Sequence, residues 1–105
     1  MPLLDEVAVT NALTSLNGWT GDTGRIARSV LAPAERAERL RIEVMGVADD
    51  VDHHPLVEHH GDALTFILWS HSAGGVTEKD IDLARRIDDI VDGDTQPQSP
   101  SPAGT

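Results

Sequence analysis

The chain contains no cysteine, few aromatic residues and no long apolar run. Its 105 residues include 2 Trp, 1 Phe and no Tyr, which leaves the core to aliphatic side chains. Without cysteine, disulfides, thiolate metal sites and thiol nucleophiles are excluded. No stretch reaches the ~20 apolar residues that a membrane-spanning helix needs, and residues 1–6 lack the basic start of a signal peptide. We therefore expect a cytoplasmic protein.

Basic residues are also scarce. The chain has 8 Lys and Arg against 18 Asp and Glu, a formal net charge of −10. Such a charge disfavours binding to nucleic-acid phosphates or anionic lipids, so we expect neither nucleic acid nor a membrane as a partner. A chain of this length forms one domain with a modest core, which association with further copies would help to stabilise.

Three segments carry apolar residues at the spacing of an amphipathic helix. They are residues 4–16, 33–51 and 77–91. The pair Asn17-Gly18 is typical of a helix end, and Pro33 is typical of the first turn of a helix. The sequence therefore predicts three helices, spread along the chain rather than grouped.

Two pairs of strands are expected between these helices. Residues 19–22 and 25–31 flank a Gly-Asp-Thr-Gly turn, and residues 56–60 and 63–71 flank Gly61-Asp62. In the last strand Leu64, Phe66 and Leu68 face one side, whereas Thr65, Ile67, Trp69 and His71 face the other. Both sides carry large apolar groups. We expect helices to cover one side and a second copy of the chain to cover the other.

This order of elements predicts an α+β fold with a four-stranded antiparallel sheet and three helices on one face, in the order α-β-β-α-β-β-α. The predicted domain spans residues 1–92. Residues 93–105 are rich in Pro, Ser, Gln and Gly, which indicates a disordered tail.

Histidine supplies the most distinctive chemistry. His53 and His54 are adjacent and precede Pro55, which favours extended geometry at the residue before it. His71 follows further along the chain, before a glycine turn. Imidazole has an unperturbed pKa near ~6.5, so it can donate or accept a proton at neutral pH. The pattern favours proton-transfer chemistry.

The motifs around these histidines resemble those of the pterin-4a-carbinolamine dehydratases. The resemblance covers roughly residues 4–91. The matching residues are Gly18-Trp19, Asp49, His53-His54-Pro55, Ser70-His71, Gly74-Gly75 and Thr77-Glu78-Lys79-Asp80. The resemblance implies removal of water from a 4a-hydroxytetrahydropterin to give a quinonoid dihydropterin, without a metal or other cofactor. It also implies a homodimer or homotetramer.

By the same resemblance, His53, His54, His71 and Asp80 are the expected catalytic residues. His53 and His71 would flank the 4a-hydroxyl group, and His54 would take or relay the N5 proton. Asp80 would orient an imidazole or hold it protonated. The residues expected to bind or support the substrate are Asp49, Pro55, Ser70, Ser72 and Trp19.

Several of these residues also have simpler interpretations. Asp80 fits the third helical position of a capping box that begins at Thr77. Gly74-Gly75 can be a plain turn, and both tryptophans can be core or interface residues. His59-His60, together with His53-His54, suggests a metal site. However, neighbouring strand residues face opposite sides, so we expect no physiological metal.

The sequence also departs from the family. Gly61 stands where the family usually has an aromatic residue. Leu56-Val57 stands where the family usually has a tryptophan soon after the proline. Residues 33–39 lack the phenylalanines that are usual at the start of the second helix. The alternative function is therefore a non-catalytic binding or assembly scaffold. Some relatives serve a transcription factor as dimerisation cofactors, and others assist Rubisco assembly. Retention of the three histidines and Asp80 favours the enzyme.

Overall fold

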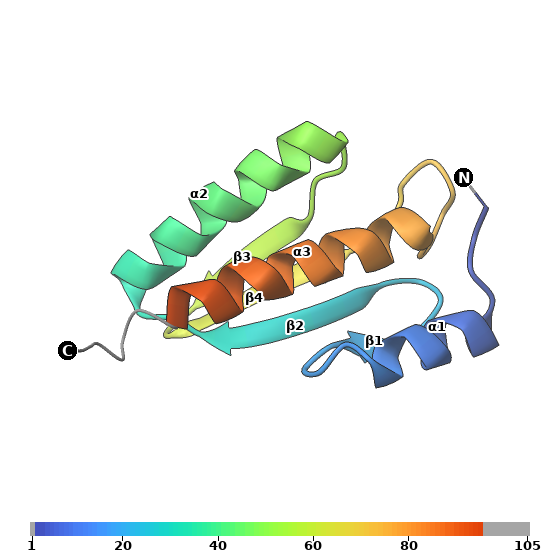
Figure 1. The fold of residues 1–105 in the computed structure, drawn as a ribbon, viewed down its shortest axis with the longest axis horizontal. Helices are drawn as coiled ribbons and strands as arrows, with labels where there is room; N and C mark the ends of the chain where they lie inside the picture. Colours follow the sequence, from blue (N-terminus) through green and yellow to red (C-terminus); the bar gives the residue numbers. More distant parts are fainter. Residues whose placement is uncertain (1, 96–105) are drawn as a thin grey trace.

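Seven elements follow one another in the computed structural model, which describes residues 2–95 (Figure 1). Their order and the α+β class are those predicted from the sequence. The elements are α1 (Glu6–Thr14), β1 (Thr20–Gly21), β2 (Ile26–Leu31), α2 (Ala34–Val51), β3 (Leu56–His60), β4 (Ala63–Leu68) and α3 (Glu78–Thr95).

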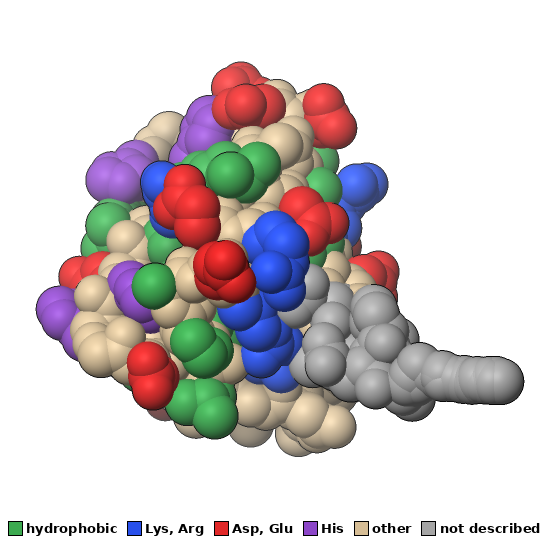
Figure 2. All heavy atoms as spheres, turned by 90° about the vertical axis from the view of Figure 1, so that its left-hand side faces the viewer, with side chains coloured by type: hydrophobic (Ala, Val, Ile, Leu, Met, Phe, Trp, Pro, Cys, Tyr) green, Lys and Arg blue, Asp and Glu red, His purple; other side chains and the backbone are tan. Residues whose placement is uncertain are grey.

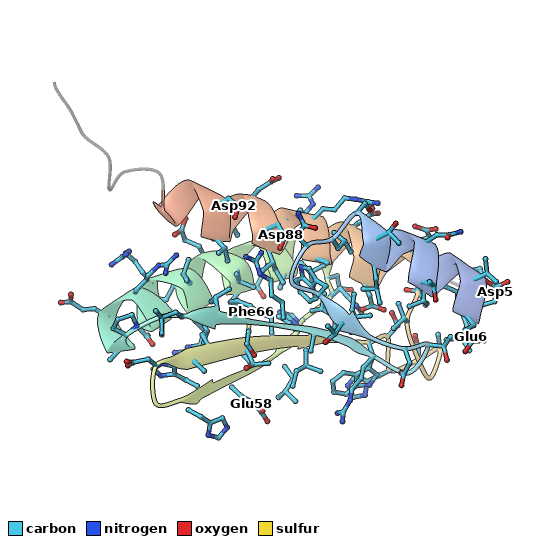
Figure 3. The ribbon with its side chains drawn as sticks, turned by 90° about the horizontal axis from the view of Figure 1, so that it is seen from below. Asp5, Glu6, Glu58, Phe66, Asp88 and Asp92 are labelled. Atoms are coloured by element: carbon cyan, nitrogen blue, oxygen red, sulfur yellow. The ribbon has the colours of Figure 1, made fainter. Side chains whose placement is uncertain are left out.

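The four strands form one antiparallel sheet in the order β1-β2-β4-β3. The central strands β2 and β4 pair along their whole length, from Ile26 opposite Leu68 to Leu31 opposite Ala63. β3 forms one edge of the sheet and the short β1 forms the other. All three helices lie on the same side of the sheet, as Figure 3 shows from below.

The core lies between this sheet and the helices. On β4, Leu64, Phe66 and Leu68 are fully buried, and Phe66 is seen between sheet and helices in Figure 3. Leu40 of α2 and Ile87 of α3 are buried in the same core. Full burial of one such side chain contributes roughly 1.5–3 kcal/mol. The intervening Thr65 and Ile67 stay partly exposed, so the predicted alternation is confirmed.

Two side-chain contacts with Asp88 join α3 to the β1–β2 hairpin and the residue before it. The Trp19 indole N–H donates to Asp88 Oδ1 over 2.8 Å, and Arg28 contacts the same oxygen at 2.5 Å. Trp19 is 4% exposed. The structure thus places Trp19 in the core, which is the simpler of the two interpretations given for it.

Two boundaries differ from those predicted. β4 ends at Leu68 rather than at residue 71, because the chain turns back and Ser70 N–H donates to the Gly75 carbonyl over 2.8 Å. Helix α3 continues to Thr95, so residues 93–95 of the predicted tail are helical, and residues 96–105 lie outside the described part. None of the described helices is long and apolar enough to cross a membrane.

Candidate active site

The first wall of the site is built where α2 ends. Asp52 adopts the left-handed conformation (φ 54°, ψ 46°), and His53 N–H donates to the Ala48 carbonyl over 3.0 Å. This six-to-one hydrogen bond is that of a Schellman motif, in which glycine usually occupies the left-handed position. Pro55 follows, and its ring prevents a further helical turn. The chain therefore leaves the helix abruptly, and His53 and His54 follow directly after the helix end.

The second wall is the loop between β4 and α3. Gly74 has φ +80°, and a Cβ on Gly75 would lie 2.5 Å from the Thr23 carbonyl oxygen. Val76 N–H donates to that same carbonyl over 2.8 Å. The two glycines thus make a turn and also let the loop press against the β1–β2 turn. His71 is presented from this loop and not from a strand.

Asp80 connects the two walls. Its carboxylate is fully buried and lies 2.5 Å from His53 Nε2 through Oδ1. Its Oδ2 accepts hydrogen bonds from the Ser70 hydroxyl and from Thr77 N–H, both at 2.9 Å. The bond from Thr77 is the capping interaction predicted for the start of α3. One carboxylate therefore caps the helix and contacts an imidazole at the same time.

These contacts set the orientation of His53. A neutral imidazole donates through one nitrogen and accepts through the other. Donation from Nε2 to Asp80 leaves Nδ1 as the nitrogen available to a ligand. The ring has little freedom, because only 13% of the side chain is exposed. A carboxylate–imidazole pair of this kind is a usual way to fix the tautomer of a catalytic histidine.

His54 is held much more loosely. Its Nε2 lies 2.6 Å from Asp49 Oδ1, but 52% of the His54 side chain and 72% of the Asp49 side chain are exposed. His71 is also exposed, and its ring centroid lies 4.6 Å from that of Trp69 with the planes tilted by 39°. The three imidazoles therefore have three different supports.

All three imidazoles line one open cleft with a volume of about 530 Å³. This lies within the range of about 300–1,000 Å³ that is usual for small-molecule sites. The adjacent pair His53-His54 and the more distant His71 therefore share one cavity, as predicted. Ser70 and Ser72 of the predicted set also line the cleft.

Four further lining residues were not among the predicted site residues. They are Asp52, Trp69, Ala73 and Lys79. Asp52 and Lys79 each adjoin a residue that was singled out, but adjacency in sequence does not show which way a side chain points. Trp69 was considered only as a core or interface residue, whereas the structure leaves it partly exposed at the cleft.

Some predicted residues lie elsewhere. Trp19 is in the core, and Pro55 is buried at the start of β3 without lining the cleft. Asp49 reaches the site only through His54. In the second histidine pair, His59 Nε2 donates to the Ala32 carbonyl over 2.9 Å. Residues 2–95 contain no group of three or more side chains placed to bind a metal ion.

Comparison with known proteins gives the same family as the sequence motifs. Residues 2–90 match the family described as pterin 4 alpha carbinolamine dehydratase. The chain belongs to this family. A protein of Mycobacterium sp. (strain KMS) is 42% identical over 94 residues, which cover 88% of this chain and 99% of that one. One of Nocardia farcinica is 38% identical over 90 residues, covering 85% and 95%. Both are provisionally named pterin-4-alpha-carbinolamine dehydratase.

A solved structure supports the fold. The crystal structure of a transcriptional coactivator/pterin dehydratase from Brucella melitensis superposes with a TM-score of 0.77 at 31% identity. The match covers 83% of this chain and 96% of that chain. The family is one of hydro-lyases, so the prediction of an enzyme family of this class is confirmed.

Proposed function

We propose that this protein dehydrates a 4a-hydroxytetrahydropterin to the quinonoid dihydropterin by histidine acid–base catalysis. In this reaction the C4a–O bond breaks, the hydroxyl leaves as water with an added proton, and N5 loses its proton as the N5–C4a double bond forms. One proton is delivered and one is removed, so the reaction is balanced without an oxidant or reductant. The observation that carries the proposal is the convergence of His53, His54 and His71 on one cleft.

The proposed role of each histidine follows from the contacts that hold its imidazole ring. His53 is fixed by Asp80 and presents Nδ1, so with His71 on the opposite loop it flanks the 4a-hydroxyl group. His54 is exposed and paired with an exposed carboxylate, which suits exchange of the N5 proton with solvent. General acid–base catalysis by such groups contributes typically ~10²–10⁴-fold each.

Replacement of single histidines tests this proposal. The carbinolamine is generated in situ, and its dehydration is followed with wild-type protein and with His53→Ala and His71→Ala. We expect each variant to lose about 10²-fold or more in rate while remaining folded. His60→Ala is the matched control, because His60 lies on β3 with its side chain 80% exposed and outside the cleft. Undiminished rates in folded His53→Ala and His71→Ala would contradict the catalytic roles.

Self-association is the second part of the proposal. Ile42 on α2 is 61% exposed and Leu56 on the edge strand β3 is 42% exposed. Apolar side chains at a sheet edge and on a helix favour burial against another copy. We propose a homodimer or homotetramer, to be measured by sedimentation. A monomer at micromolar concentration would contradict this part and leave the chemistry standing.

A scaffold function is the alternative, because the Brucella relative is described as a coactivator as well as a dehydratase. A nucleic-acid partner is still not expected. On the face shown in Figure 2, Lys and Arg side chains form a short band flanked by acidic side chains, not a broad basic surface. A folded protein whose dehydration rate equals the uncatalysed background would favour the scaffold.

A further inference from the structure

A second hollow adjoins the catalytic cleft and has no part in the proposed reaction. It has a volume of about 380 Å³ and lies between the β1–β2 turn and the loop that carries His71. We call it the outer subsite. Its lining residues are Asp22, Gly24, Arg25, Trp69 and Gly74. Trp69 lines both cavities, so the outer subsite and the catalytic cleft share one wall residue.

The walls of the outer subsite are preformed. Asp22 N–H donates to the Arg25 carbonyl over 3.0 Å, which closes the β1–β2 turn. Asp22 Oδ1 accepts hydrogen bonds from the backbone N–H groups of Gly24 and Arg25, at 2.8 and 3.3 Å. The Val76–Thr23 hydrogen bond then joins this turn to the loop of His71. A ligand therefore meets a site that needs little ordering, which reduces the entropic cost of binding.

Trp69 gives the outer subsite a planar apolar surface. The chain has only three aromatic residues, and the other two, Trp19 and Phe66, are buried in the core. Trp69 is partly exposed, and one neighbour of its ring is His71 of the catalytic cleft. An exposed indole in a chain so poor in aromatic residues offers a stacking partner for a second ring.

Arg25 gives the same hollow a positive charge. No ion pair involving its guanidinium occurs within the described residues 2–95, whereas Arg28 pairs with Asp88 and Arg41 with Glu38. The acidic residue of the hollow, Asp22, is engaged through Oδ1 with the backbone of its own turn. A guanidinium binds carboxylates strongly because it can donate two parallel hydrogen bonds.

On the basis of the proposed function, we propose that the outer subsite binds the C6 substituent of the pterin substrate. The substituent that it fits combines a planar ring, which stacks on Trp69, with a carboxylate, which pairs with Arg25. The pterin C6 atom is bonded to N5, the neighbour of C4a, so this substituent starts from the reacting ring. His71, which flanks the reacting carbon in the proposed function, adjoins Trp69. The substrate class is therefore a pterin whose C6 extension contains an aryl ring and a carboxylate.

Calorimetric titration with two stable probes tests this inference. The probes are unsubstituted pterin and folic acid, which adds a benzoyl ring and two carboxylates at C6. We expect the wild-type protein to bind folic acid about tenfold more tightly than pterin, and Arg25→Gln to lose most of that gain. Arg85→Gln is the matched control, because it removes the same charge from an exposed site on α3 and should keep the gain.

A second variant tests the stacking surface. Trp69→Leu keeps an apolar side chain but removes the planar face, so we expect it to lower the ratio of folic acid to pterin affinity. Equal affinities of the wild type for the two probes, or the same ratio in Arg25→Gln and Arg85→Gln, would overturn this inference and leave the proposed reaction untouched. Failure of the wild type to bind either probe would overturn both.

Discussion

Two carboxylate–imidazole pairs lie side by side in this protein, and they differ in burial. Asp80 is fully buried and holds His53, whereas Asp49 and His54 are both exposed by half or more. The interatomic distances are nearly equal, at 2.5 and 2.6 Å. The distance between the two atoms therefore does not measure how much a pair stabilises the protein. Water screens the charges of the exposed pair and competes for its hydrogen bonds.

The two carboxylates also differ in their number of hydrogen-bond partners. Asp80 accepts hydrogen bonds from three groups on two segments: His53 after α2, and the Ser70 hydroxyl and Thr77 N–H in the loop before α3. Among the described residues 2–95, the Asp49 carboxylate contacts only His54, five residues away. Loss of Asp80 leaves several buried groups without a partner. Loss of Asp49 leaves groups that water can satisfy.

The largest expected effect is on stability, in Asp80→Ala. Each buried donor that loses its acceptor costs about 1–3 kcal/mol, so we expect a loss of at least about 3 kcal/mol. Urea denaturation measures it. A loss below about 1 kcal/mol would show that the buried pair is no more important than the exposed one.

Asp80→Asn should separate stability from catalysis. An amide oxygen can still accept from Ser70 and Thr77, but its NH2 group then faces His53 Nε2 and forces that nitrogen to accept. The proton moves to Nδ1, the nitrogen that the proposed function assigns to the ligand. We expect a folded protein whose dehydration rate falls by about 10²–10⁴-fold. Retention of the wild-type rate would show that the tautomer of His53 does not matter.

Ser70→Ala should have an intermediate effect. The Ser70 hydroxyl donates to Asp80 and lies 2.8 Å from the Thr77 hydroxyl, so its loss removes one charge-assisted hydrogen bond. The expected cost is about 1.5–3 kcal/mol in urea denaturation. A cost as large as that of Asp80→Ala would mean that the loop, not the carboxylate, holds the network together.

Asp49→Ala should have the smallest effect. The pair is exposed, and a negative charge in the last turn of α2 opposes the helix dipole, so we expect a change within about 0.5 kcal/mol. The dehydration rate should fall less than in Asp80→Asn. A larger loss of rate than in Asp80→Asn would reverse the comparison and make His54 the more constrained catalyst.

Local patterns predicted the fold well. Alternation in β4 identified the buried set Leu64, Phe66 and Leu68, and the order of the elements gave the sheet with its helices. The end of β4 was placed too late, because residues 69–71 continue the alternation. The Ser70–Gly75 hydrogen bond that ends the strand is not visible in a pattern.

The site was predicted only in part, for a physical reason. The Asp80–His53 contact joins residues 27 positions apart, and no periodicity fixes such a distance. The resemblance to a family supplied the residues instead. The cleft also contains Asp52 from the turn after α2, Trp69 from the loop after β4 and Lys79 from the start of α3. No local sequence pattern shows how these three segments are arranged relative to one another.

The central claim is that the adjacent imidazoles of His53 and His54 and the more distant imidazole of His71 act on one ligand. Nuclear magnetic resonance of histidine ring nitrogens, with a pterin added stepwise, tests it most directly. We predict that the signals of His53, His54 and His71 shift together with one binding constant, while those of His59 and His60 stay unchanged. Shifts confined to one of the three rings, or equal shifts at His59 and His60, would contradict it.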